Sequence, residues 1–239
     1  MFIFKSKKVV VDLLVSETNA YALKLFPPKH AKYTIPSWFK SCPKSTYSWE
    51  LNEAKKTVKG CVGIRNYLTK GFVTPLFSDI NIKTSSENIY WNIAGFPGEK
   101  ITYHDTLIQS PNFYTDFFVL KVNSPWLATS KKRNVELMTV NAQYHSTNSL
   151  NFTVFQGVTN IDVSANLNFF MAFKKENAIH ELKAGEILNQ WVPLSYDDVE
   201  ICTHVVSEQE YLKKQTLEKP FSFCFSGIKR YNILRKGNT

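Results

Sequence analysis

Histidine and aspartate are the side chains here best suited to proton transfer or metal binding, and their spacing matches no known catalytic motif. None of the histidines belongs to an H-E-x-x-H motif or to the H-x-D pair of a non-haem iron site. His104 and Asp105 are adjacent, and adjacent residues of a strand point to opposite faces. A metal site built from distant histidines is left open, but the sequence assigns no metal ligand, cofactor or catalytic residue. The five histidines are His30, His104, His145, His180 and His204.

Four cysteines are the candidate nucleophiles, and their spacing matches no zinc-site pattern. None belongs to a C-x-x-C pair, and they stand at Cys42, Cys61, Cys202 and Cys224. We expect all four to be reduced and buried, because an unpaired cysteine usually serves as a small apolar side chain. Arg65 lies one helical turn after Cys61, and a nearby cation can lower the pKa of a thiol. We still expect Cys61 to be inert, since it falls on the apolar side of a predicted helix.

An acidic cluster near the end of the sequence has two interpretations. Asp197, Asp198 and Glu200 follow Tyr196, and paired carboxylates can bind a hard cation. The segment Ser-Tyr-Asp-Asp is also ordinary turn composition. We therefore expect a solvated turn.

A run of three basic residues is the local candidate for an anion site. Lys131, Lys132 and Arg133 lie between two predicted strands, a few residues after Trp126. A basic loop beside an aromatic side chain can hold phosphate or nucleic acid. A charge run this short is more often the solvated tip of a loop, which is the default interpretation.

Four further residues are candidates for lining a ligand pocket between two β-sheets. They are Asp79, Trp91, Trp126 and Gln190. Tryptophans are usually buried, and one beside a polar group can line such a pocket. No G-x-S-x-G, P-loop or G-x-G-x-x-G motif accompanies them, so the pocket carries no assigned reaction.

The elements that must position these residues are mostly strands. Aromatic residues make up 14% of the 239 residues, and aromatic side chains favour strands. Short alternating or apolar segments predict strands over 9–16, 79–83, 88–93, 113–122, 135–144, 150–155, 158–163, 168–173, 186–194 and 199–206.

Helices are fewer, and a polar loop is expected over 45–56. Pro36 suits the first turn of a short helix, and apolar spacing predicts a second helix over 57–70 that ends at Gly71. Ser207 and Glu210 form a capping box for a third helix over 208–218.

The net charge of +9 is unevenly distributed. Residues 1–50 carry +5, residues 151–200 carry −4 and residues 201–239 carry +4. A basic excess suits nucleic acid or another anionic partner. However, 20 acidic residues dilute the field and no known nucleic-acid motif occurs, so the sequence argues against nucleic acid without excluding it.

The order of several short motifs resembles an uncharacterised family of proteins encoded by marine bacteriophages and some bacteria. The resemblance covers roughly residues 30–215, and the family has no established activity. Its pattern usually has Pro where this chain has Glu186. The motifs are Ile35-Pro36-Ser37-Trp38-Phe39-Lys40, Cys42-Pro43, Thr57-Val58-Lys59-Gly60-Cys61, Gly71-Phe72-Val73-Thr74-Pro75 with Asp79, Asn123-Ser124-Pro125-Trp126, Phe169-Phe170-Met171-Ala172-Phe173 and Gly185-Glu186-Ile187-Leu188-Asn189-Gln190-Trp191-Val192-Pro193.

Together these observations predict one β-rich α+β domain over residues 1–239. We expect mostly antiparallel, sandwich-like or jelly-roll-like sheets with two or three short helices. The first choice of function is a non-enzymatic phage-type binding or structural module; the alternative is an enzyme or small-ligand protein. No signal peptide and no apolar run of roughly 18 residues occurs, so we expect no membrane partner and a cytoplasmic location, in the host cell if a phage encodes the chain.

Overall fold

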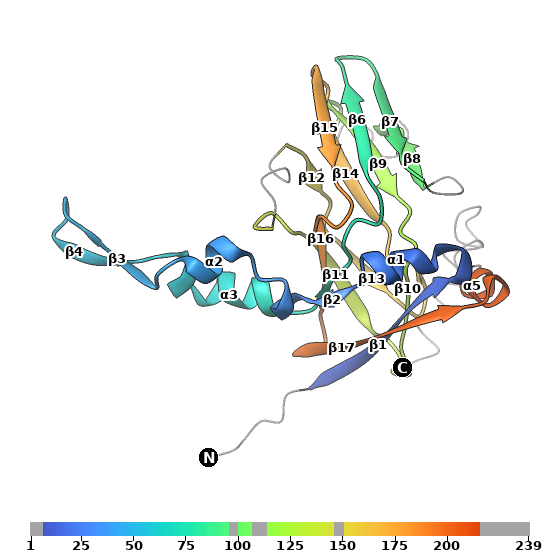
Figure 1. Cartoon of the computed structure of the whole chain (residues 1–239), viewed down its shortest axis with the longest axis horizontal. Coiled ribbons are helices and arrows are strands. Elements are labelled where there is room, and N and C mark those ends of the chain that lie inside the picture. The colour runs from blue at the N-terminus through green and yellow to red at the C-terminus, as the bar shows by residue number, and fades with distance from the viewer. Residues whose placement is uncertain (1–6, 96–99, 107–113, 146–150, 216–239) are drawn as a thin grey trace.

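The described part of the protein contains four β-sheets, a small hairpin and several short helices. The computed structural model describes residues 7–95, 100–106, 114–145 and 151–215 (Figure 1). The predicted β-rich α+β class with several antiparallel sheets is confirmed.

The first sheet joins strands from distant parts of the sequence in the order β10-β1-β17. Its central strand β1 (Lys8–Ser16) pairs antiparallel with β10 (Leu127–Thr129). It also pairs in parallel with β17 (Asp198–Val206) along all nine residues, from Lys8 opposite Asp198 to Ser16 opposite Val206. Residues 8–16 are therefore held on both sides by much later segments.

A five-stranded antiparallel sheet has the order β13-β11-β16-β5-β2. Its strands are β2 (Lys29–His30), β5 (Phe72–Val73), β11 (Glu136–Asn141), β13 (Gly157–Asn160) and β16 (Asn189–Pro193). The short strands β2 and β5 lie on either side of residues 31–71 in the sequence, a segment that projects from the sheets. This sheet therefore holds the two ends of that segment.

Two further antiparallel sheets complete the body. One has the order β12-β14-β9-β8, from β8 (Ile101–His104), β9 (Phe117–Val122), β12 (Thr153–Val154) and β14 (Phe169–Lys174). The other has the order β15-β6-β7, from β6 (Ile80–Thr84), β7 (Ile89–Ile93) and β15 (Ala178–Leu182).

The helices are short and lie outside the sheets. They are the 3-10 turns η1 (Glu17–Asn19), η2 (Ala31–Tyr33) and η3 (Val58–Gly60), and the α-helices α1 (Ala20–Leu25), α2 (Ser37–Ser41), α3 (Val62–Thr69) and α5 (Glu208–Gln215). The hairpin of β3 (Ser45–Ser48) and β4 (Glu53–Lys56) connects α2 to η3 and α3. Figure 1 shows these elements projecting from the body to one side.

One apolar cluster unites the sheets. It contains side chains from every sheet of the body, including Val11, Phe72, Ile80, Leu120 and Trp191. A smaller cluster places Tyr211 of α5 against Leu14 and Leu127. The prediction of a single domain over residues 1–239 stays a prediction.

Several predicted elements differ from the structure. The segment expected as a polar loop, 45–56, contains the β3–β4 hairpin. The helix expected over 57–70 is the turn η3 followed by α3, and the strand expected from residue 113 begins at Phe117. The helix expected over 208–218 is described to Gln215, and its remaining residues lie outside the described ones.

Candidate functional site

The projecting segment, residues 37–70, is the most distinctive surface of the protein, and we call it the arm. It comprises α2, the β3–β4 hairpin, η3 and α3 (Figure 1). Between positions 40 and 66 no residue is buried, so most of the arm has no core of its own. Seven basic and two acidic side chains give the arm a net charge of +5, more than half of the total of +9.

The two faces of the hairpin differ in character. Directly paired residues of antiparallel strands share a face, and faces alternate along each strand. One face carries Tyr47 and Lys56. The ring of Trp49, two residues after Tyr47, contacts the Tyr47 ring edge-to-face, with 4.8 Å between the ring centroids. The opposite face carries Lys55 and Glu53, which form an ion pair at 2.8 Å. The first face is therefore aromatic and basic, while the second is electrically balanced.

The tip of the hairpin exposes apolar side chains. Trp49 is 87% exposed and Leu51 is 58% exposed. Asn52 completes the turn with a φ of 48°, in the left-handed region that Asn tolerates better than most residues. An exposed tryptophan at the end of a basic projection is unusual for a surface that only faces water.

Four lysines surround the base of the hairpin: Lys40, Lys44, Lys56 and Lys59. Lys59 donates its ammonium to the main-chain oxygen of Lys40 at 2.5 Å, and the amide of Thr57 donates to the oxygen of Lys44 at 3.0 Å. A methyl group on Gly60 would lie 3.2 Å from the oxygen of Lys44 and 3.5 Å from Cβ of Lys56. Within the described residues none of the four lysines forms an ion pair, so their charge is uncompensated.

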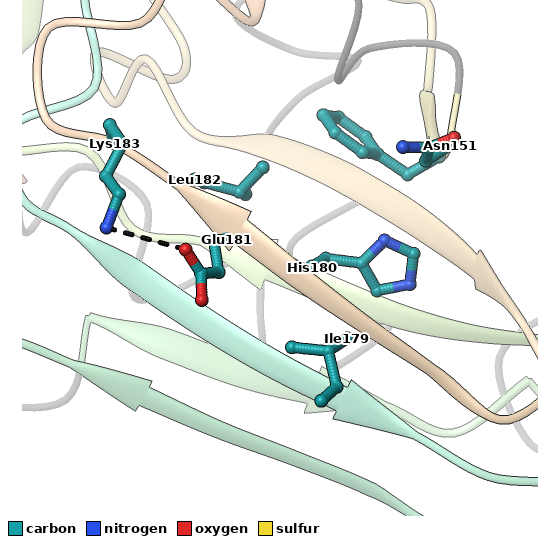
Figure 2. Close-up of a pocket in the computed structure, with 7 residues that line it drawn as sticks. Asn151, Ile179, His180, Glu181, Leu182 and Lys183 are labelled. Atoms are coloured by element: carbon teal, nitrogen blue, oxygen red, sulfur yellow. Dashed lines mark ion pairs between the residues drawn. The ribbon is translucent and has the colours of Figure 1, made fainter.

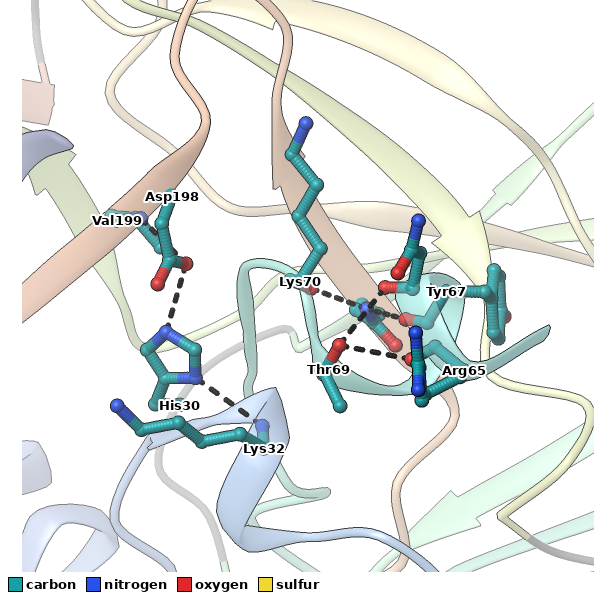
Figure 3. Close-up of polar contacts among 10 residues, drawn as sticks. His30, Lys32, Arg65, Tyr67, Thr69, Lys70, Asp198 and Val199 are labelled. Atoms are coloured by element: carbon teal, nitrogen blue, oxygen red, sulfur yellow. Dashed lines mark hydrogen bonds and ion pairs between the residues drawn. The ribbon is translucent and has the colours of Figure 1, made fainter. Parts of the chain in front are cut away.

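The arm is joined to the body by specific hydrogen bonds. Gln190 of β16 donates from Nε2 to the main-chain oxygens of Tyr67, at 2.6 Å, and Lys70, at 2.5 Å (Figure 3). The hydroxyl of Tyr67 donates to the main-chain oxygen of Asn141. Burial, and to a lesser extent Tyr144, raises the pKa of Tyr67 to about 12, so this hydroxyl stays protonated as a donor. The base of the arm is therefore fixed in place.

Gln190 was predicted to line a pocket, and its side chain is instead fully buried against α3. Trp126 is also buried at 1% exposed, while Trp91 packs half-buried against the core cluster. Asp79 accepts a hydrogen bond at Oδ1 from the amide of Ala184 at 2.8 Å. None of the four predicted residues lines the pockets described below.

The basic run Lys131, Lys132 and Arg133 lies in an exposed bend after β10. The amide of Lys132 donates to Oγ of Ser130 at 3.2 Å, and Asn134 follows with a φ of 56°. These contacts order the backbone of the bend. The anion site predicted here stays a prediction.

One pocket, with a volume near 460 Å³, lies beside the junction of β2 and β17. Its lining includes His30 and Asp198, which form a hydrogen bond of 2.9 Å between Nε2 and Oδ1 (Figure 3). The amide of Lys32 donates to Nδ1 of His30 at 3.2 Å, so Nδ1 is the acceptor and Nε2 carries the hydrogen. Both ring nitrogens are thus engaged, which leaves none free to act as a general base.

The solvated turn expected around Asp198 is therefore incorrect in part, because Asp198 begins β17 and binds His30. Asp197 accepts a hydrogen bond from the amide of Lys7 at 2.7 Å. Both carboxylates therefore form structural contacts with segments near the start of the chain.

A second pocket of about 570 Å³ lies along β15 (Figure 2). Burial lowers the pKa of His180, with Glu176 opposing the effect, and its ring packs 4.9 Å from Phe173. Glu181 pairs with Lys183 at 3.8 Å, and both are mostly exposed. The pocket therefore combines a half-buried histidine of lowered pKa with a solvated ion pair of small energetic weight.

Cysteines and histidines form no further candidate centre. No group of three or more His, Cys, Asp or Glu side chains suited to a metal ion occurs in the described parts of the chain.

Cys42, Cys61 and Cys202 are free, as expected, but Cys61 is exposed and the other two are half-buried. The expected burial is wrong, because Cys61 lies at the start of α3 in the thinly packed arm. Cys224 lies outside the described residues.

The comparisons with known proteins find no protein similar to this chain. Neither a family model nor a curated protein nor a solved structure matches the chain. The resemblance to the marine phage family therefore stays a prediction. None of the helices in the described ranges has the length and apolar character needed to cross a membrane.

Sequence reasoning missed the arm, although two signals in the sequence point to it. The segment from Ser45 to Trp49 is rich in β-branched and aromatic types, which favour strands. The net positive charge per residue is also higher over 37–70 than over residues 1–50 or 201–239. Both the strand-favouring residue types and the high net charge are visible when residues 37–70 are considered as one segment.

Proposed function

We propose that this protein is a non-enzymatic binding module whose arm binds nucleic acid. The observation that carries the proposal is the arm itself, a projecting element of net charge +5 with uncompensated lysines around an aromatic hairpin. Lysines placed in this way attract a polyphosphate and release its counterions, which is the main source of affinity for nucleic acids. A two-stranded ribbon also has a width that the grooves of nucleic acids accept.

The enzymatic alternative has less support from the described residues. The pocket at His30 has both imidazole nitrogens engaged, and the pocket on β15 offers a half-buried histidine without a neighbouring nucleophile among its lining residues. A catalytic pair needs a nucleophile within hydrogen-bond reach of a free base. A binding surface on the arm needs no such arrangement.

The proposal is tested with a pair of matched double variants of the full chain. Lys44→Gln with Lys56→Gln removes two exposed charges from the arm, and Lys131→Gln with Lys132→Gln removes two exposed charges from the bend after β10. Binding of fluorescent single-stranded and duplex DNA is titrated against salt for both variants and the parent.

We expect the parent to bind at low salt and the arm variant to bind more weakly. Its slope of log binding constant against log salt concentration should be smaller by about 1.4 for single strands and about 1.8 for duplex. Each of the two lost phosphate contacts contributes about 0.7 to this slope for single strands and about 0.9 for duplex. The bend variant should keep the parental slope. Absence of binding by the parent at low salt would refute the proposal, and a change confined to the bend variant would move the site to residues 131–133.

A further inference from the structure

The exposed indole at the tip indicates which form of nucleic acid the arm takes. We infer that the arm selects single-stranded nucleic acid, with Trp49 stacking on an unpaired base. This inference rests on the function proposed above.

The first step is the exposure of Trp49. Its side chain is 87% exposed, and its ring contact is the edge-to-face packing with Tyr47. Such packing leaves aromatic surface open to a further flat partner. Tyr47 is itself 45% exposed, so the two rings together form an aromatic platform at the end of the hairpin.

The second step is the position of this platform relative to the lysines. Tyr47 and Lys56 share one face of the hairpin, and Lys44, Lys40 and Lys59 gather at its base. Four strand residues rise about 3.3 Å each, so the base and the tip are about 13 Å apart. A strand laid along this face can place phosphates at the lysines and a base on the platform.

The third step is the composition of the ribbon. Among the side chains that read base edges, Arg, Asn and Gln are absent from β3 and β4, and the lysines of β4 can bind phosphates at any sequence. Stacking on an aromatic ring tolerates any base, because every base has a π-face. The site is therefore suited to binding without sequence preference.

The last step separates single strands from duplex. In a duplex both faces of a base are covered by its neighbours, so Trp49 can stack only where a step has been opened at a cost. In a single strand the bases are free to leave their neighbours and stack on aromatic side chains. Charge from the lysines attracts both forms, and Trp49 adds affinity for the single strand alone.

The test uses the full chain and three variants. Trp49→Ala removes the stacking ring, Trp49→Phe keeps an aromatic ring, and Tyr90→Ala removes an aromatic side chain on β7 that is 65% exposed and lies outside the arm. Each variant is titrated with polythymidine and with a duplex of equal charge at one salt concentration. Thermal unfolding confirms that the variants are folded.

We expect Trp49→Ala to weaken binding of polythymidine by about 5- to 150-fold, the range for losing one stacked base, and to leave duplex binding unchanged. Trp49→Phe should retain most of the affinity, and Tyr90→Ala should match the parent. Binding should quench tryptophan fluorescence in the parent, and the quenching should fall sharply in Trp49→Phe.

Three outcomes would overturn the inference, and they are distinguishable. If polythymidine binds Trp49→Ala as tightly as the parent while the lysine variant is weakened, the inference fails and the proposed function stands. If the parent binds neither nucleic acid, both fail. If Trp49 fluorescence shifts to shorter wavelength on vesicles of phosphatidylserine and phosphatidylcholine, and no oligonucleotide binds, the arm contacts membrane surfaces instead.

Discussion

Gly71 lies directly against the backbone of Trp191, so that a methyl group at Gly71 would stand 2.0 Å from the main-chain oxygen of Trp191. Gly71 also has a φ of +78°, a conformation that side-chain-bearing residues rarely adopt. It lies between the end of the arm and β5, which pairs with β16. The point where the arm rejoins the body thus requires glycine.

Replacing Gly71 with alanine should destabilise the protein by about 3 kcal/mol or more, because the strained φ and the clash with Trp191 add. Gly157→Ala is the matched control, since nothing lies within 4 Å of a methyl group there and its φ is not positive. Chemical denaturation of both variants measures the difference. Equal midpoints would contradict the close approach.

Gln190→Met should loosen the attachment of the arm and lower the free energy of unfolding by about 2 kcal/mol. The methionine fills a similar volume but leaves the oxygens of Tyr67 and Lys70 without their donor. Gln209→Met, at an exposed position of α5, is the control. Hydrogen exchange should rise in α3 for Gln190→Met alone, and unchanged exchange there would count against an anchoring role.

Ser207→Ala should cost about 1 kcal/mol of stability. Ser207 precedes α5, and its hydroxyl oxygen accepts a hydrogen bond from the amide of Glu210 at 3.3 Å, as the capping box predicts. Ser86→Ala, at an exposed turn position, is the control. Superimposable urea melts for Ser207→Ala and the parent would show that this contact does not cap the helix.

His145 should make the protein less stable as the pH falls below 6.5. Burial lowers the pKa of His145 below its usual 6.5, so in this range the unfolded chain takes up a proton that the folded chain does not. Stability therefore rises with pH between the folded and unfolded pKa values and levels off above 6.5. His145→Gln should flatten that part of the curve of unfolding free energy against pH; a slope identical to the parent's would mean that other groups control it.

Most strands of the body could be predicted because their side chains alternate or form short apolar runs. The segment predicted over 9–16 matches β1 to within one residue. Strand β15 was missed because its middle departs from the usual pattern: Ile179 is 72% exposed and the more polar His180 faces inward, although Leu182 is buried. Pattern reasoning assigns apolar residues to the core and fails where one of them is exposed.

The arm and the pairings of the first sheet were not predicted, for different reasons. A hairpin that projects into solvent buries neither face, so β3 and β4 carry no hydrophobic period. The pairing of Asp12 with Cys202 joins residues far apart in the sequence, and nothing local encodes it. Gln190 was predicted to line a pocket between sheets, and its buried position and its partners became clear only when α3 was placed against β16.

The parallel pairing of β1 with β17 also determines when the fold can be completed. Residues 8–16 emerge from the ribosome well before their partners, residues 127–129 and 198–206. During synthesis this apolar strand has both edges unpaired, a state that favours aggregation until the later segments arrive. Contacts of such long sequence separation also slow folding, because the loop must close before the pairing contributes. Expression of the chain should therefore depend on keeping its first strand protected until residue 206 has been made.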